Sequence, residues 1–306
     1  MAEAPLLTRG LPPILFGKET YSDVSAEAIT SRHNPLVKHV RAARDEKDSE
    51  LIFVEGVRLC EEVARSIVIE DVLYTEELTR DARGAAILEE LRVKARRVVP
   101  VTEEVLAAVS DTKTPQGIVA LARRPRTDYD AFQRKLENED APPLVVVAHR
   151  VNNPSNAGAM LRVAEAAGAT GFITSVGSTD VFSPKALRGA MGSSFRLPIW
   201  TGATFSEMIL WCDQNGIRAV STDVRATTLH TGLDWNVPRA IILGAEAGGL
   251  DEAESAAASE RIKIPMRAPV ESLNVATALA VILYEAARQR DEATRGKGTN
   301  GETGKG

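Results

Sequence analysis

Five consecutive apolar residues, Leu144-Val-Val-Val-Ala148, constrain the fold of this chain more than any other feature. A strand that is apolar at every position must be buried on both faces, as in parallel sheets covered by helices. Strand-like runs recur at Gly171–Ser175, Arg218–Thr222, Ala240–Leu243 and Arg261–Ile264. The intervening segments have room for helices, so the sequence predicts an open, mostly parallel α/β sheet with helices on both faces over residues 144–291.

A smaller unit precedes this sheet. Strand-like and helix-like segments alternate between Ile29 and Ala122, which predicts a second α/β domain over residues 26–125. Residues 126–143 are polar and contain prolines, so we expect a linker there. The first 25 residues lack periodicity and are expected to form a flexible arm. Residues 292–306, rich in Gly, Lys, Thr and Glu, are expected to be a disordered tail.

The composition excludes several classes of protein. The net charge of −5 over 306 residues argues against a surface that binds nucleic acid everywhere, although it permits a local basic patch. Cys60 and Cys212 form no CxxC pair, and the four histidines have no ligand spacing, so we expect neither disulfides nor metal. No run has membrane-spanning length and no secretory signal is evident, which predicts a cytoplasmic protein without a membrane partner.

Polar residues follow the first buried strand in the segment Asn152 to Gly168. Either Ser155 or Asn156 is placed to cap the helix that follows, and Gly158 would let another backbone approach closely. Arg162 follows Asn156 by six residues, within reach of a ligand bound at the helix start. The alternative is an ordinary capped helix that carries a surface arginine.

A glycine-rich segment, Leu243-Gly-Ala-Glu-Ala-Gly-Gly-Leu250, follows a later strand. Its spacing matches neither the dinucleotide-binding GxGxxG pattern nor a phosphate-binding P-loop. The glycines indicate a sharp turn or a close approach to a ligand, and Glu246 would lie in that turn. The alternative for Glu246 is an acidic side chain that merely favours a helix start.

A third polar segment lies between a strand end and a long apolar helix. Ile264-Pro-Met266 ends the strand, and Ser272-Leu-Asn274 opens the helix expected over Val275 to Ala287. Helix N-termini present unpaired N–H groups, and ligands of such sheets bind beyond the carboxyl ends of the strands. The alternative is a helix of the core that is capped by Ser272.

Basic side chains provide candidate contacts to phosphate. Lys185 and Arg188 lie three residues apart and share one face of a predicted helix. Further candidates near the N-terminal unit and the linker are Lys38, Arg41, Arg44, Arg123, Arg124 and Arg126. For each of them, a solvated surface charge is the alternative.

The three polar segments together resemble the ordered motifs of the SpoU (TrmH-type) RNA ribose 2′-O-methyltransferases, in the SPOUT class. The resemblance covers Leu144 to Arg290. A weaker one relates Ile29 to Lys38 and Phe53-Val-Glu-Gly56 to the family's ribosomal-protein-like substrate-binding domain. Two departures stand out: residues 45–50 are mostly acidic where the family often carries a basic run, and Asn153 replaces the usual acidic residue before the proline.

The resemblance implies a deep trefoil knot, a homodimer and S-adenosylmethionine (SAM) as the cofactor, with no metal. It implies that the backbone around Gly244, Ile264 and Leu273 holds SAM, with further contacts from Thr222, Met266 and Asn274. Arg162 matches the family's catalytic arginine, which would act either as a base or as a stabiliser of a developing alkoxide. The side chains expected to orient it and the substrate are Asn156, Glu246, Ser272 and Asn274.

The activity implied is methyl transfer from SAM to a ribose 2′-hydroxyl, with ribosomal RNA expected more than transfer RNA. Lys38, Arg41, Arg44, Lys185 and Arg188 would contact that RNA. A catalytically silent RNA-binding or ribosome-assembly factor of the same fold is the alternative. A nucleotide-dependent metabolic enzyme is disfavoured, because neither phosphate-binding loop pattern is present.

Overall fold

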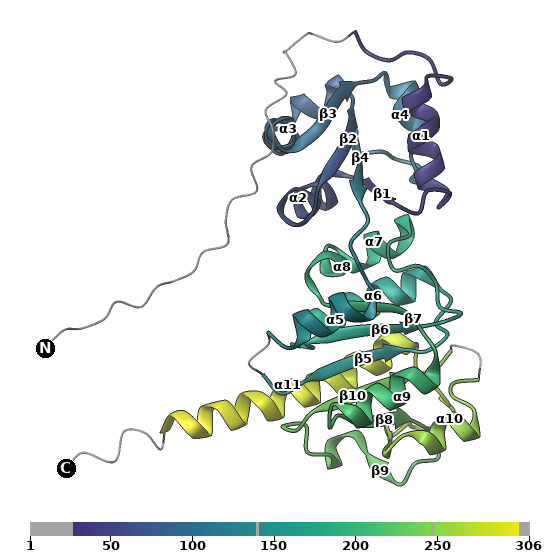
Figure 1. Ribbon diagram of the computed structural model, residues 1–306, viewed down its shortest axis with the longest axis vertical. Helices are drawn as coiled ribbons and strands as arrows, with labels where there is room; N and C mark the ends of the chain where they lie inside the picture. The colour runs from purple at the N-terminus through teal and green to yellow at the C-terminus, as the bar shows by residue number, and fades with distance from the viewer. Residues whose placement is uncertain (1–26, 139–140, 246–247, 300–306) are drawn as a thin grey trace, which may run out of the picture.

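The computed structural model describes residues 27–138, 141–245 and 248–299, with side chains through residue 295 (Figure 1). The expected arm over residues 1–25 and the side chain of Glu246 lie outside the described residues. Two sheets organise the chain, one of four strands and one of seven. Among the described residues, no helix is long and apolar enough to cross a membrane.

The N-terminal unit is a four-stranded mixed sheet in the order β1-β4-β2-β3, covered by helices on both faces (Figure 1). Phe53, Leu73 and Leu121 pack towards α1 and α4, whereas their neighbours Ile52 and Val72 pack towards α2 and α3. This alternation follows from the two-residue period of a strand. The elements are α1 (Pro35–Arg44), β1 (Leu51–Glu55), α2 (Val57–Ser66), β2 (Ile69–Tyr74), η1 (Glu76–Arg80), α3 (Ala82–Lys94), β3 (Ala95–Pro100), α4 (Glu103–Val109) and β4 (Ile118–Arg123).

The second unit is a seven-stranded sheet in the order β7-β6-β5-β10-β8-β11-β9, and every strand pair in it is parallel. Its elements are α5 (Tyr129–Leu136), β5 (Leu144–Ala148), α6 (Pro154–Ala166), β6 (Gly171–Ser175), α7 (Pro184–Ala190), α8 (Ser193–Arg196), β7 (Ile199–Ala203), α9 (Phe205–Gln214), β8 (Arg218–Thr222), β9 (Thr228–Leu229), η2 (His230–Gly232), β10 (Arg239–Leu243), α10 (Glu252–Ala257), β11 (Glu260–Lys263) and α11 (Val275–Thr299).

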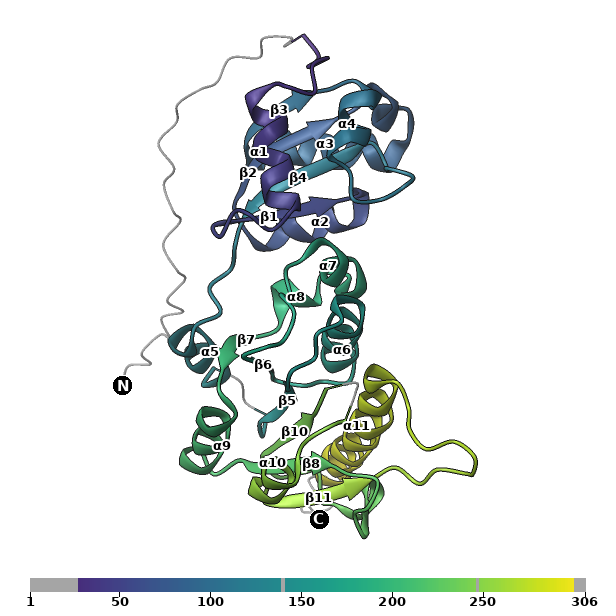
Figure 2. The same ribbon diagram turned by 90° about the vertical axis from the view of Figure 1, so that its right-hand side faces the viewer.

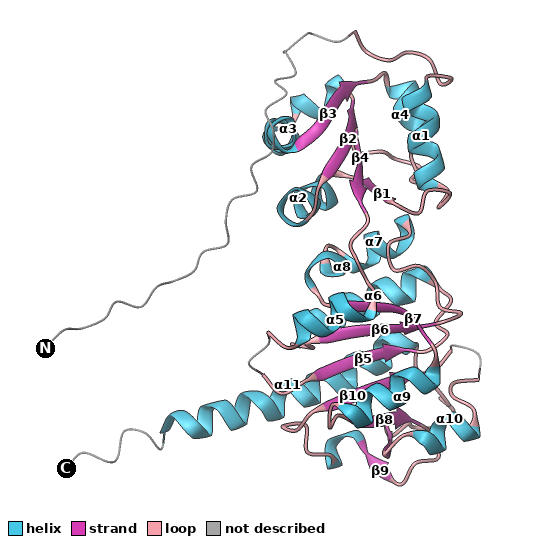
Figure 3. Cartoon of the chain, in the orientation of Figure 1, coloured by secondary structure: helices cyan, strands magenta, loops and turns pink. Residues whose placement is uncertain are grey.

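Helices cover both faces of this parallel sheet (Figure 3). Strand β5 is fully buried along its whole length, as its apolar run requires. Val146 faces the helices α6, α7 and α11, while Val145 and Val147 face α5 and α9. The predicted open parallel sheet is therefore confirmed. The trefoil knot stays a prediction.

The segment predicted to be a linker, residues 126–143, contains helix α5. Asp128 caps this helix, and Phe132 is fully buried against the second sheet. The aromatic ring of Phe132 lies so close to Gly171 that an added Cβ there would approach it to 2.8 Å. The polar appearance of the segment comes from the solvent-facing side of a short amphipathic helix.

Helix α11 extends to Thr299, although the sequence predicted its end at Ala287 and a disordered tail from residue 292. Arg288 bridges Glu285 and Glu292, one turn away on either side. Arg290 donates to the backbone oxygen of Trp235 at 2.8 Å. These contacts stabilise a polar extension that has little apolar periodicity of its own.

The two units meet where α7 and α8 lie against β1 and α2 (Figure 2). Among the described residues, three arginine–carboxylate pairs cross this boundary. They join Arg124 to Asp180, Arg188 to Asp111 and Arg196 to Glu62. The guanidinium of Arg124 also lies 5.0 Å from the ring centre of Phe182. The N-terminal unit is thus held directly above the helices that precede β7.

Candidate active site at the carboxyl edge of the parallel sheet

The three polar segments meet at one edge of the second sheet. Strands β5, β10, β8 and β11 are consecutive in the sheet and run in parallel. Leu243 pairs with Ala148, and Ile262 pairs with Thr222, so these four strands end within a few residues of one another. Each of the three segments, and Thr222, therefore emerges at the same carboxyl edge, where ligands of such sheets bind.

A hydrogen bond joins the first and third segments. The side-chain amide of Asn274 donates to Oδ1 of Asn156 at 3.0 Å, across 118 residues of sequence. Oδ1 of Asn274 also accepts from the backbone N–H groups of Ala276 and Thr277 and thereby caps α11. The alternative, in which Ser272 caps this helix, is wrong, because Ser272 lies two residues further from the helix and is exposed.

The cap of α6 also differs from the prediction. Asn153, and neither Ser155 nor Asn156, accepts from the backbone of the first turn, at 2.9 Å from the Ser155 nitrogen. Asn156 is thereby left inside the helix, where its side chain can meet Asn274. The expected close approach at Gly158 is confirmed, because a Cβ there would lie 2.3 Å from the Ala186 oxygen on α7.

The glycine-rich segment folds tightly back on itself. A Cβ at Gly244 would lie 2.2 Å from the carbonyl carbon of Gly249, and the Gly249 nitrogen donates to the Ala245 oxygen at 3.0 Å. Gly248 and Gly249 are exposed and have φ angles of 105° and 66°, in the region that favours glycine. The segment therefore presents bare backbone at the sheet edge.

The residues expected around SAM fit such a ligand. Ile264, Met266 and Leu273 are half-buried, and the segment from β11 to α11 projects away from the sheet (Figure 2). Thr222 is half-buried as well, and its hydroxyl donates to the Ile242 oxygen at 3.4 Å. Partly exposed apolar side chains beside an exposed glycine turn are suited to a purine and its ribose.

Arg162 is exposed on α6 and stands apart from the asparagine pair. Six residues separate it from Asn156, which corresponds to about 9 Å along a helix axis and to a different helical face. Within the described part of the chain, neither Arg162 nor Ser272 has an ion pair or side-chain hydrogen bond. The chain thus gathers Asn156, Asn274, Gly244 and Thr222 at the edge, and it leaves Arg162 open to another molecule.

Sequence reasoning missed a partly buried polar cluster beside this edge, formed by His149, Arg150 and Glu254. His149 Nε2 lies 3.0 Å from Glu254 Oε1, and Arg150 Nη2 donates to Glu254 Oε2 at 2.6 Å. The pKa of His149 is lowered, chiefly because burial disfavours the charged imidazolium. The pattern Asp251-Glu-Ala-Glu254, which forms a capping box, was the sequence signal for this cluster.

Most of the arginines predicted to contact phosphate are engaged within the protein. Arg41 and Arg44 donate to backbone oxygens of Ala108 and Ser110, at 3.1 to 3.3 Å. Arg188 pairs with Asp111 across the boundary between the units. Arg123, Arg124 and Arg126 pair with Glu70, Asp180 and Asp128. Lys38 and Lys185 are exposed, and neither has an ion pair among the described residues.

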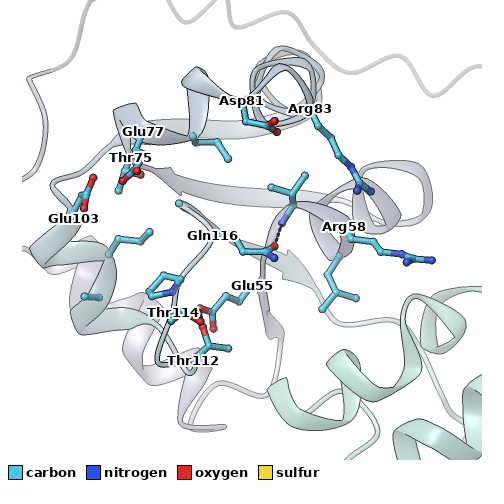
Figure 4. A pocket seen from close by; sticks show the side chains of 18 of the residues that line it. Glu55, Arg58, Thr75, Glu77, Asp81, Arg83, Glu103, Thr112, Thr114 and Gln116 are labelled. Carbon is cyan, nitrogen blue, oxygen red and sulfur yellow. Dashed lines mark hydrogen bonds between the residues drawn. The ribbon is translucent and has the colours of Figure 1, made fainter.

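An open groove of about 1120 Å³ lies in the N-terminal unit, away from the three segments (Figure 4). Its walls are the β1–α2 turn with Arg58, the start of α3 with Arg83, and the loop that precedes β4. Arg188 and Met191 of the second unit close one end. Gln116 fixes the wall, since its Oε1 accepts from the Val57 nitrogen at 3.1 Å. Glu55 and Gly56 of the Phe53-Val-Glu-Gly56 segment line this groove, although the groove itself was not predicted from the sequence.

The described residues contain no group of three or more His, Cys, Asp or Glu side chains arranged to hold a metal ion. Cys60 and Cys212 are both free and buried. Burial raises the pKa of each thiol to about 12, so neither is a reactive thiolate at neutral pH.

Comparisons with known proteins assign the chain. Residues 143–284 match the SpoU rRNA methylase family, and residues 34–120 match the MRM3-like substrate binding domain. The chain is 31% identical to an uncharacterized tRNA/rRNA methyltransferase of Synechocystis, over 88% of this chain and 96% of that one. The chain belongs to the SpoU rRNA methylase family.

Two further similar proteins support this assignment. A 23S rRNA (guanosine-2′-O-)-methyltransferase of Ralstonia nicotianae is 32% identical over 74% of this chain and 90% of its own length. The SpoU methyltransferase AviRb of Streptomyces viridochromogenes, solved with its cofactor AdoMet, superposes with a TM-score of 0.74 at 26% identity. That superposition covers 84% of this chain and 98% of AviRb. The SPOUT-type fold and SAM as the cofactor follow from membership in this family.

Proposed function

We propose that this protein transfers a methyl group from SAM to a ribose 2′-hydroxyl of ribosomal RNA. The observation that carries the proposal is the convergence of three SpoU segments on one sheet edge, joined by the bond between Asn156 and Asn274. Several SpoU relatives bear names of 23S rRNA 2′-O-methyltransferases, which favours ribosomal RNA over transfer RNA.

SAM supplies an electrophilic methyl group on its sulfonium. The ribose oxygen gains a bond to that methyl carbon as the carbon–sulfur bond breaks, and the hydroxyl proton leaves to solvent or to a base. A free guanidinium is effectively never deprotonated, so we assign Arg162 to stabilising the developing alkoxide. Asn156, Glu246, Ser272 and Asn274 would orient the ribose and the cofactor. Holding the nucleophile and the methyl donor in line contributes much of the rate.

We further propose that the protein acts as a homodimer in which the partner subunit completes the site. Arg162 is exposed and lies on a different helical face from Asn156, so a single chain does not gather the catalytic set. Val281 and Tyr284 on α11 are 37% and 57% exposed, which supports a subunit contact along the helix that packs on α6. Free, buried cysteines agree with a cytoplasmic location.

RNA would contact the N-terminal unit and the outer face of α7. Lys38 and Lys185 are the predicted phosphate contacts whose charges remain open to solvent. Arg41, Arg44 and Arg188 would act less directly, since they already hold the loop from Ala108 to Asp111. The groove of Figure 4 is lined by Ala107 and Thr112, the residues on either side of that loop, and is our candidate for holding an RNA segment.

A transfer assay tests this proposal. The protein is incubated with methyl-labelled SAM and either 23S ribosomal RNA or total transfer RNA, in separate reactions at equal nucleotide concentration. Label in ribosomal RNA supports the proposal, and label confined to transfer RNA redirects the substrate. SAM binding without any transfer would support a silent RNA-binding factor. The Arg162→Ala protein serves as the background control.

A further inference from the structure

The carboxylate of Glu254 on α10 holds two successive residues of the loop that follows β5. Oε1 meets His149 Nε2 at 3.0 Å, and Oε2 accepts from Arg150 Nη2 at 2.6 Å. The side chains of Glu254 and His149 are only 14% and 5% exposed. An ionised carboxylate that accepts hydrogen bonds from two donors in such surroundings fixes the orientation of both donor side chains as well as their distance from it.

The loop held in this way is the one that leads to the first SpoU segment. Arg150 has a φ of 54°, an unfavourable conformation for a residue with a side chain. Its nitrogen donates to Ser175 Oγ on β6 at 2.8 Å, and the nitrogen of His149 donates to the Leu243 oxygen at 2.9 Å. The loop then reaches Asn153 and α6, so its path sets the position of Asn156 and Arg162.

Glu254 also belongs to the glycine-rich side of the site. Its nitrogen donates to Asp251 Oδ1 at 2.8 Å, and its Oε2 accepts from the Asp251 nitrogen at 3.0 Å. These two bonds start α10 directly after Gly248, Gly249 and Leu250. One carboxylate therefore fixes the end of the glycine-rich segment and the loop that carries the first segment.

The surroundings of His149 select the neutral imidazole as a donor. Its ring packs edge-on against Phe205, with the ring centres 5.0 Å apart. Its Nδ1 is buried and has no partner among the described residues. Burial lowers the pKa of His149, against the opposing effect of Glu254, while Arg150 lowers it further and Asp251 raises it. The arrangement fits a neutral ring whose Nε2–H donates to Glu254.

We propose that Glu254 is a positioning residue, which aligns the ribose side of the site with the cofactor side by holding His149 and Arg150. This inference rests on the proposed methyl transfer. Among the described residues, Glu254 makes no hydrogen bond or ion pair with Thr222, Gly244, Ile264 or Leu273, the residues expected around SAM. Its loss is expected to disturb alignment, while SAM still binds.

The test compares Glu254→Gln with the parent protein in single-turnover methyl transfer to ribosomal RNA and in a calorimetric titration with SAM. The expected result is a rate about 10- to 100-fold lower, as a displacement near 1 Å produces, with SAM affinity within about threefold of the parent. Glu252→Gln is the matched control. It lies on the same helix with a side chain 70% exposed, and it should keep the parental rate.

A donor series at position 149 covers the case in which Glu254→Gln fails to fold. His149→Gln keeps a side-chain N–H for Glu254 and is expected to retain most of the rate, whereas the apolar His149→Phe is expected to lose it. A rate for Glu254→Gln within threefold of the parent overturns the inference. The inference is also overturned if Glu254→Gln loses rate and SAM affinity to the same extent, or if His149→Gln and His149→Phe have equal rates. A parent protein that labels no RNA would instead refute the proposed function.

Discussion

The N-terminal unit and the carboxyl edge of the second sheet build binding surfaces in opposite ways. The groove of the N-terminal unit is formed by a turn, a helix start and the loop that precedes β4. Glu55, Arg41 and Arg44 hold the beginning of that loop in place. The sheet edge is assembled from segments far apart in the sequence, and Arg162 remains outside the assembled set. We propose that the difference reflects two roles, in which the groove is a preformed surface for RNA and the sheet edge is completed by its ligand and by a partner subunit.

Among the substitutions that distinguish the two regions, Arg162→Ala should produce the largest loss of methyl-transfer rate. Removing one donor that stabilises a developing oxyanion costs about 100- to 1000-fold in rate, so single-turnover transfer should fall by at least that much. SAM binding and RNA binding should persist, because Arg162 contacts neither the asparagine pair nor the groove. Arg134→Ala, an exposed arginine on α5, is the control. Undiminished turnover of Arg162→Ala would remove this residue from the mechanism.

Gly244→Ala should damage the reactive edge while it spares the N-terminal unit. The added Cβ would lie 2.2 Å from the Gly249 carbonyl carbon, and forcing it in costs about 1–3 kcal/mol. SAM affinity, measured by calorimetry, should fall by about tenfold or more, with RNA affinity retained. At Gly232 a Cβ would meet only the Thr228 methyl group, at 3.7 Å, so Gly232→Ala is the matched control. Normal SAM binding by Gly244→Ala would place the cofactor elsewhere.

Arg58→Glu tests the groove and should have the reverse effect, with RNA binding weakened and SAM binding retained. Arg58 lines the groove at the start of α2, and reversing its charge should weaken RNA binding by about tenfold and lower the salt dependence by about one phosphate contact. SAM affinity should stay unchanged. Arg65→Glu reverses a charge at the far end of the same helix and should have less effect. Equal effects of the two substitutions would mean that general charge, and not the groove, attracts RNA.

Mild acid should loosen the second unit through Glu285. Hydrogen bonds from Arg288 and Gln289 hold the pKa of this carboxyl at about 2, below its ordinary value of 4.5. Because the folded pKa is the lower one, the stabilisation is present above pH 4.5 and is lost as the pH falls towards 2. Urea titrations at pH 7 and pH 3.5 should therefore differ less for Glu285→Gln than for the parent. An unchanged difference would contradict this contribution.

The fold was predictable wherever burial dictated the pattern. The apolar run of β5 indicated a parallel sheet, and the alternation of strand-like and helix-like segments between Ile29 and Ala122 indicated the smaller α/β unit. Helix α5 was missed because only Phe132 and Leu136 of an otherwise polar segment are buried, and the end of α11 was missed because ion pairs stabilise it more than apolar periodicity does.

The site was predictable as a set of segments, and its internal bonds were not. Order and spacing indicated Asn156 and Asn274, but only the folded chain brings them to 3.0 Å. The sequence could not show which of several neighbouring polar residues would cap each helix. In the structure, Asn153 and Asn274 cap α6 and α11 in place of their neighbours. Glu254 was missed because its partners His149 and Arg150 lie about a hundred residues away in the chain.

The most direct test of the central claim is the identity of the methylated atom. The protein is incubated with ribosomal RNA and SAM that carries a trideuterated methyl group, and the RNA is digested to nucleosides for mass spectrometry. The account predicts the deuterated methyl on a ribose 2′-oxygen, in a reaction that requires Arg162. Deuterium found only on bases, or an equal yield from Arg162→Ala, would contradict it.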